Sequence, residues 1–520
     1  WRTIATPHFR IHYYQGGETL ARRVAVLAEE AHDRCLEFLG LEASETVEVV
    51  LRDDSDASNG FTTVYPYDRI ELLASPPGPD SELASFEDYV RTLFFHEYVH
   101  VVHMDSVAGL PRLLNRLIGK TALPNGAVLS WFTEGLATFA ETRLTPGGRV
   151  GSSLYDMYLR AAALGRGLLD LSALTVTPMR LPRGAAPYLY GSYFLDHLWT
   201  RHGLEPLKSF IRDYGARIVP FAMNTLARRH YGRDFLSLYE DFRDEMRDRA
   251  RAEAVRVRQR GEVPGRSVTI DGEFHLYPVF SADSRRVLHV RLDGRSTGGL
   301  FETEMATGAS RRIADCYGGC GRIALADGFA YTTHDDVWRI HEVHADIWRV
   351  DPSGREERLT RRARARDVSV GPDGTLYWVT SEYERVSIRA RPPSSAGAPE
   401  RDVVPPGRFD GLAGPQVVPG TSRLVFSGAR GGRWDLWATD LAGGEPVRLT
   451  DDGCIDRDPA VSPDGRWIVF STDRDGIYDI HALELATGMV RRATGVLGGA
   501  FQPAVSPDGR SLAFVSYSDR

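Results

Sequence analysis

Cysteine, long apolar runs and an excess of basic charge are all scarce in this sequence of 520 residues. Four cysteines are too few to form the disulfide scaffold of a chain this long. No apolar stretch approaches the roughly 20 residues of a membrane-spanning helix, so we expect no transmembrane segment. The net charge of -7, from 63 basic and 70 acidic residues, argues against a nucleic-acid partner.

Two of the cysteines lie close together, on either side of a Tyr-Gly-Gly segment. Cys316 and Cys320 can close a small loop in an oxidising compartment, or remain two free thiols. A metal site built from cysteine pairs needs a second pair, and the chain has none. The sequence leaves the choice between bridge and thiols open.

The chain is too long for one hydrophobic core and divides by its periodicity. Residues 1–255 contain long helical patterns, such as those over 18–39 and 235–254, and are predicted to form an α+β domain. We place a linker at 256–270, because it contains the Gly- and Pro-bearing segment 261–265. Residues 271–520 form short alternating segments broken by Pro, Gly and Asp, which predicts an all-β domain.

The all-β region repeats at intervals of about 44 to 47 residues. Comparable segments begin at Pro278, Ile323, Val368, Pro415, Pro459 and Pro503. This period, with several strands in each repeat, is typical of a β-propeller. Six repeats predict about six blades, of which the last is incomplete. Either the segment 267–270 completes that blade, or the natural protein continues past Arg520.

The last repeats resemble a known propeller family. The turns 462–465 and 506–509, both Ser-Pro-Asp-Gly, and the segments 427–436 and 471–480 are similar to TolB-type repeats. The resemblance spans residues 270–520 and is weakest in the second and third repeats. It implies a bacterial, extracytoplasmic protein of the periplasm or cell envelope, in which the propeller binds substrates or an envelope protein.

The N-terminal region contains the HExxH motif His96-Glu97-Tyr98-Val99-His100. Residues four apart lie on one face of a helix, so both imidazoles can bind one zinc ion. Glu97 lies near that face and can act as general base. The apolar pattern over 86–96 predicts a buried helix, in which two histidines and a glutamate are costly unless they are paired or bind metal.

A third zinc ligand is needed, and Glu134 is the best candidate because it begins another apolar helical stretch. Its surroundings resemble the gluzincin metallopeptidases, whose aminopeptidase branch has a Trp-x-x-Glu-Gly segment with a zinc-binding Glu. The matching residues are Trp131, Glu134, Gly135, Ala137, Phe139 and Glu141. The interval between His100 and Glu134 is longer than in that branch, and we expect the extra stretch, 106–130, to form a loop over the cleft.

Further roles follow from the same resemblance. A Tyr-x-x-Gly tyrosine would stabilise the transition state, which gives Tyr188 as first choice and Tyr190 as second, unless both rings are core packing. Glu141 is expected to hydrogen-bond near the zinc ligands. For Asp105 two interpretations remain open: it orients a zinc-bound histidine, or it plays no part in the site. His103 is a spare ligand or, more simply, a polar neighbour.

The segments 6–13, 56–61 and 188–192, together with the two motifs above, resemble bacterial peptidase-like domains joined to TolB-type propellers, and this resemblance spans residues 1–255. We therefore expect a zinc peptidase that cleaves polypeptides. The Gly-rich acidic segment with which the aminopeptidase branch grips a free amino terminus is not found, which favours an endopeptidase. The segment 68–74 is expected to be an edge strand that pairs with substrate. The alternative is an inactive peptidase-like scaffold whose propeller mediates protein–protein binding at the envelope.

Overall fold

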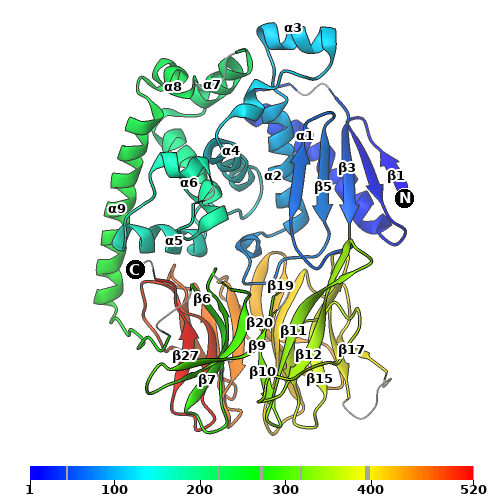
Figure 1. The fold of residues 1–520 in the computed structure, drawn as a ribbon, viewed down its shortest axis with the longest axis vertical. Helices are drawn as coiled ribbons and strands as arrows, with labels where there is room; N and C mark the ends of the chain where they lie inside the picture. The colour runs from blue at the N-terminus through cyan, green and yellow to red at the C-terminus, as the bar shows by residue number, and fades with distance from the viewer. Residues whose placement is uncertain are drawn as a thin grey trace.

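The computed structural model describes residues 1–42, 45–176, 178–218, 222–269, 273–294, 296–316, 319–392 and 399–518. Two domains are stacked along the long axis of the molecule (Figure 1). The upper domain mixes helices with one sheet, and the lower domain is a β-propeller. The predicted multidomain organisation is thereby confirmed.

The upper domain contains one mixed five-stranded sheet in the order β1-β2-β3-β5-β4. Strands β2, β3 and β5 are parallel, whereas β1 and β4 run antiparallel to their neighbours at the two edges. Its strands are β1 (Arg2–Ala5), β2 (Phe9–Tyr13), β3 (Val47–Arg52), β4 (Gly60–Thr63) and β5 (Arg69–Leu73).

The helices of this domain lie beside the sheet and extend away from it across the upper domain (Figure 1). They are α1 (Glu18–Leu39), α2 (Tyr89–Met104), α3 (Gly109–Ile118), α4 (Ser130–Leu144), α5 (Ser153–Leu164), α6 (Ala186–His202), α7 (Glu205–Gly215), α8 (Met223–Tyr231) and α9 (Phe235–Gln259). Short 3-10 turns lie at η1 (Glu82–Ser85), η2 (Pro124–Ala127), η3 (Leu171–Thr175) and η4 (Arg183–Ala185). Helix α1 has the predicted bounds, because its apolar stripe is buried and Gly40 ends it with a left-handed backbone conformation.

Helix α9 extends past the predicted domain boundary at residue 255. Its charged stretch stays helical with ion pairs between residues three apart, such as Arg247–Asp244, and Val257 is still buried near its end. The first propeller strand begins at Phe274. The connection between the two domains therefore begins later than the predicted linker, after Gln259, and ends before Phe274.

The propeller has five complete four-stranded blades rather than six. The first blade consists of β6 (Phe274–Phe280), β7 (Arg286–Leu292), β8 (Gly299–Glu304) and β9 (Ser310–Asp315), and the second of β10 (Ala324–Ala326), β11 (Phe329–Trp338), β12 (Glu342–Val350) and β13 (Glu356–Arg358). The third consists of β14 (Arg366–Val370), β15 (Leu376–Glu382), β16 (Arg385–Arg391) and β17 (Arg401–Val404), and the fourth of β18 (Gly411–Val417), β19 (Arg423–Arg430), β20 (Arg433–Asp440) and β21 (Val447–Arg448). The fifth consists of β22 (Asp456–Val461), β23 (Trp467–Thr472), β24 (Asp479–Glu484) and β25 (Val490–Arg492). The sixth repeat forms only the two-stranded sheet of β26 (Phe501–Val505) and β27 (Leu512–Val515), which lies between β22 and β6. Residues 264–269 form no strand that completes it, and residue 270 lies outside the described residues.

The first strands of five of the six repeats share a bulge. Tyr277, Asp367, Gly414, Asp458 and Gln502 all have positive φ, and each lies where the strand pairing shifts register. Hydrogen bonds at these bulges connect neighbouring blades: Asp458 accepts from the Gln502 amide at 3.2 Å, and the Gln502 side chain accepts from the Tyr277 amide at 2.8 Å. The last bond closes the ring between the final sheet and the first blade.

The segment between β5 and α2 rests on the propeller (Figure 1). Asp80 forms an ion pair with Arg457 of β22 and accepts a hydrogen bond from the Tyr277 hydroxyl of β6 at 3.0 Å. Trp434 of β20 donates a hydrogen bond to the backbone oxygen of Ala84 at 3.1 Å. Because this segment leads directly into α2, the propeller holds the base of the helix that carries the HExxH motif.

Candidate metal centre

Helix α2 brings the two motif histidines together. It begins after Asp88, whose side chain accepts a hydrogen bond from the amide of Arg91. His96 and His100 are both buried and lie one turn apart, with their Nε2 atoms 3.2 Å from each other. Two nitrogens that face each other at this distance can share one cation between them.

Glu134 lies in the first turns of α4 and points to the same place. Its Oε2 atom is 3.2 Å from Nε2 of His100 and 3.7 Å from Nε2 of His96. Ligand atoms about 2.0–2.2 Å from a tetrahedral zinc ion lie roughly 3.3–3.5 Å apart. The three ligand atoms are therefore already spaced as a zinc site requires, and the donor set of two histidines and a glutamate leaves a fourth position for water.

The close contacts within the site shift the pKa values of Glu134 and His96. Burial raises the pKa of Glu134, but the imidazoles of His100 and His96 outweigh it and lower the pKa below its usual value. Burial likewise lowers the pKa of His96, but Glu134 and Glu141 raise it to about 9. Without metal, His96 is therefore protonated at neutral pH, and a cation that binds here must displace that proton.

Glu141 contacts His96 from the side away from Glu134, as the sequence predicted for a supporting carboxylate. Its Oε2 atom is 2.9 Å from Nδ1 of His96. The carboxylate is fully buried and accepts two hydrogen bonds of 2.8 Å from Arg149. Arg149 was not predicted from the sequence, since it follows α4 in a Gly-rich turn with no motif around it. It fixes the carboxylate that in turn orients His96.

Replacement of Arg149 should weaken metal binding without removing a ligand. In Arg149→Met, Glu141 loses both hydrogen bonds from Arg149 and is left as a buried carboxylate whose remaining contact is with His96. We expect zinc affinity to fall about 10- to 100-fold, the usual cost of losing such a supporting contact. Competition titration with a zinc-sensitive dye measures the change. An unchanged affinity in a folded Arg149→Met protein would show that Arg149 only stabilises the fold.

The side chain of Glu97 extends from α2 toward the edge strand β4. Its Oε2 atom accepts a hydrogen bond of 2.7 Å from the Thr62 hydroxyl, which also bonds the Glu97 backbone oxygen. A Cβ atom on Gly60 would lie 2.7 Å from Oε1 of Glu97, so only glycine lets the strand approach so closely. Neither Gly60 nor Thr62 was assigned a role from the sequence, although 56–61 belongs to the segments that carry the peptidase-like resemblance.

The predicted edge strand was one strand away from the true edge. The segment 68–74 forms β5, which lies inside the sheet between β3 and β4. Strand β4 is the edge, and its outer side has no strand partner among the described residues. The apolar residues of β5 made it the clearer strand in the sequence. They are buried because β5 is an internal strand, whereas the edge strand β4 is more exposed.

The two candidate tyrosines have different positions. The Tyr188 ring stacks on His96, with centroids 5.9 Å apart, and the nearby Glu134 carboxylate adds to the burial that raises the pKa of its hydroxyl. Tyr190 points to another side of α6 and is 1% exposed in the hydrophobic core, which fits the core-packing alternative. The structure therefore brings Tyr188 to the site and not Tyr190.

Two glycines explain why Tyr188 lies beside Glu134. A Cβ atom on Gly191 would lie 2.0 Å from the backbone oxygen of Trp131, and one on Gly135 would lie 2.5 Å from the backbone of Gly191. Helices α4 and α6 therefore cross with their backbones in contact at these positions. Tyr188 lies one turn before Gly191, and Glu134 directly precedes Gly135. The close crossing therefore holds the Tyr188 side chain against the Glu134 carboxylate.

Asp105 does not orient a zinc-binding histidine, and that prediction is wrong. It caps the end of α2 and forms a 2.6 Å ion pair with Lys120, which also bonds Asp68 at 2.6 Å. His103 packs on Phe132, and both its ring nitrogens lack a hydrogen-bond partner among the described residues. Burial lowers the pKa of His103 to about 3, so it is a neutral core residue.

The stretch 106–130 was expected to be a loop over the cleft. Instead it contains helix α3, which stands at the upper end of the molecule (Figure 1). Its leucines follow a helical period that the Gly and Pro content of the stretch obscured.

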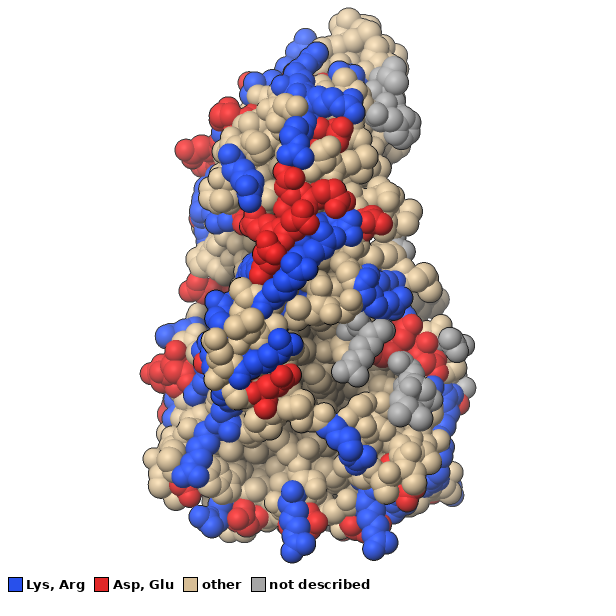
Figure 2. Space-filling view, turned by 90° about the vertical axis from the view of Figure 1, so that its left-hand side faces the viewer, with Lys and Arg blue, Asp and Glu red and all other residues tan. Residues whose placement is uncertain are grey.

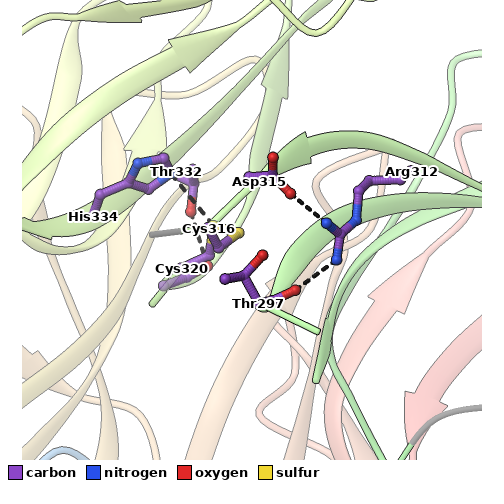
Figure 3. Close-up of a disulfide and its surroundings, with 8 residues drawn as sticks. Thr297, Arg312, Asp315, Cys316, Cys320, Thr332 and His334 are labelled. Carbon is purple, nitrogen blue, oxygen red and sulfur yellow. Dashed lines mark hydrogen bonds and ion pairs between the residues drawn. A yellow bond between two sulfur atoms is a disulfide. The ribbon is translucent and has the colours of Figure 1, made fainter. Parts of the chain in front are cut away.

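Cys316 and Cys320 form a disulfide, with Cα atoms 5.4 Å apart. Figure 3 shows the bridge beside His334 and Thr332 of β11. On the strand before it, Arg312 pairs with Asp315 and bonds the backbone of Thr297. The bridge closes the small loop that the sequence had left undecided.

One family model matches this chain, and its match lies within the lower domain. Residues 400–520 match the family model described as TolB beta propeller domain. The C-terminal part of the chain carries a TolB-type β-propeller domain. This matches the resemblance stated for the last repeats and does not include the domain that contains the metal centre.

Solved structures similar to part of this chain include TolB from Acinetobacter baumannii, with 15% identity, a TM-score of 0.39, and coverage of 45% of this chain and 57% of that chain. A putative TolB from Agrobacterium tumefaciens has 18% identity and a TM-score of 0.40, over 48% of this chain and 94% of that chain. An uncharacterized protein from Treponema pallidum is 25% identical over 205 residues, which are 39% of this chain and 18% of that relative. The chain thus spans less than a fifth of that relative's length. Among the described residues, no helix is long and apolar enough to cross a membrane.

Proposed function

We propose that the upper domain is a zinc peptidase and that His96, His100 and Glu134 hold its metal. The observation that carries this proposal is the spacing of the three ligand atoms, which lie within 4.8 Å of one another. Zinc bound there would supply a Lewis acid and lower the pKa of a water molecule to near neutrality. The other steps fall to residues of the chain itself.

Glu97 serves as the general base, and then the general acid, of the proposed reaction. Its carboxylate is held by Thr62 beside the histidines, within the same turn of α2. It accepts the proton of the attacking water and gives it to the leaving amine. The Tyr188 hydroxyl, next to Glu134, donates a hydrogen bond to the oxyanion that forms when the peptide carbonyl is attacked.

Strand β4 is placed to bind the substrate. It is the sheet edge nearest to Glu97, because Thr62 of this strand bonds the glutamate directly. An extended polypeptide can add to such an edge through backbone hydrogen bonds, whatever its side chains. Binding of this kind favours internal segments of a chain and supports an endopeptidase. The propeller contributes by fixing the segment that leads into α2.

We place this activity outside the cytoplasm, at the bacterial envelope. The Cys316–Cys320 disulfide supports this proposal, since such bridges persist in oxidising compartments. A protein partner bound by the TolB-type propeller would belong to the same compartment.

Metal removal tests the proposed function. Treatment with 1,10-phenanthroline should reduce cleavage of unfolded β-casein to background, and stoichiometric zinc should restore it. The activity needs the cation because a zinc ion held there would polarise the peptide carbonyl and lower the pKa of the attacking water. A treated, metal-free protein that cleaves casein at its original rate would refute the proposal.

A further inference from the structure

Helix α3 exposes an apolar ridge at the upper tip of the molecule (Figure 1). Leu110, Leu113, Leu117 and Ile118 are 48%, 51%, 71% and 67% exposed. Their spacing of three, four, seven and eight residues places them along one side of the helix. Within α3 only Pro111 is fully buried, so this side of the helix has no apolar partner in the chain as described.

The helix is fixed at its ends and not along its length. The Ala108 amide donates to Gly215 at 3.0 Å, and the Asn115 side chain bonds the backbone of Thr121 and Ala122 just after the helix. Lys120 anchors the far end to Asp68 and Asp105. A helix of ten residues is marginal on its own in water. These anchors therefore hold it formed, with its ridge pointing outward.

The charged side chains of α3 itself are both basic. They are Arg112 and Arg116, and the helix contains no Asp or Glu, whereas Lys120 beyond its end is paired with Asp68 and Asp105. Arg112 and Arg116 lie four residues apart and flank the leucines on one side of the helix. In Figure 2 the tip shows tan atoms with blue side chains close by, and red patches begin further down.

We propose that α3 docks this protein onto the surface of an anionic phospholipid bilayer. An amphipathic helix with leucines on one side and arginines beside them lies in the headgroup region, where its apolar side chains enter the acyl boundary. The arginines then face the negative surface. Lipid is favoured over a protein partner because α3 combines exposed apolar side chains with two arginines and no acidic side chain, at a tip that leaves room for a flat surface. This inference does not depend on the peptidase proposal.

Sedimentation with phospholipid vesicles tests the inference. The full chain should bind vesicles of phosphatidylethanolamine and phosphatidylglycerol, and bind phosphatidylcholine vesicles at least about tenfold more weakly. Binding should weaken as salt is raised, because the Debye length falls to about 3 Å at 1 M. Leu113→Asp/Leu117→Asp should reduce binding to the anionic vesicles at least tenfold. The matched control is Leu236→Asp, since Leu236 is a 54% exposed leucine on α9, and it should bind as the unchanged protein does.

Three results would overturn the inference. The first is that the full chain binds neither kind of vesicle. The second is that the double variant, with an unchanged melting temperature, binds as well as the original. The third is that the ridge proves to join two copies of the chain, seen as a dimer in sedimentation velocity that Leu113→Asp/Leu117→Asp dissociates while vesicle binding is absent.

Discussion

The Glu97→Gln protein should bind zinc as tightly as the original and yet lose about 10²- to 10⁴-fold in the rate of peptide cleavage, the usual contribution of a positioned general base. Glutamine keeps the shape of the side chain and can still accept the hydrogen bond from Thr62, but it cannot take up a proton. Cleavage of a quenched fluorescent peptide measures the rate, and metal analysis measures the zinc.

Glu37→Gln provides the control for this change, because Glu37 is an exposed glutamate on α1. It should retain full activity. If Glu97→Gln kept both its zinc and its full cleavage rate, the carboxylate would not be the base, and the non-catalytic scaffold would become the better account of the domain.

Loss of a ligand should have the second large effect. In Glu134→Ala and in His100→Ala, zinc affinity should fall by more than about 100-fold, since loss of a supporting contact alone costs 10- to 100-fold. In the unchanged protein, affinity should rise with pH up to about 9, because Glu134 and Glu141 raise the pKa of His96 to about 9 and zinc requires the neutral imidazole. Isothermal titration at several pH values measures both effects.

His103→Gln is the matched control on the same helix. His103 lies one turn beyond His100 but is not among the clustered ligand atoms. It should keep one zinc per chain with little change in affinity. Equal losses in His103→Gln and His100→Ala would point to general damage to α2, and would remove the support for a specific site.

The sequence predicted the features that depend on local periodicity. The interval of four between His96 and His100 places them on one helix face in any α-helix, and the repeat of about 45 residues dictates a propeller. The bulges at Asp458 and Gln502 lie just before the repeated prolines at 459 and 503, so the repeat marks the first strand of each blade.

The features that the sequence missed depend on contacts between distant segments. Thr62 reaches Glu97 only because β4 folds back antiparallel on β5, and Arg149 reaches Glu141 only after the turn that follows α4. Asp105 was misjudged because its partner, Lys120, comes from beyond helix α3. The presence of Gly135 and Gly191 in the sequence was a signal that α4 and α6 could pack closely, since glycine permits close approach of backbones.

Anomalous diffraction at the zinc absorption edge, from crystals of the zinc-loaded protein, tests the central claim most directly. The account predicts one peak about 2.0–2.2 Å from Nε2 of His96, Nε2 of His100 and a carboxylate oxygen of Glu134. A peak elsewhere, or none at these three side chains in a fully zinc-loaded protein, would contradict it.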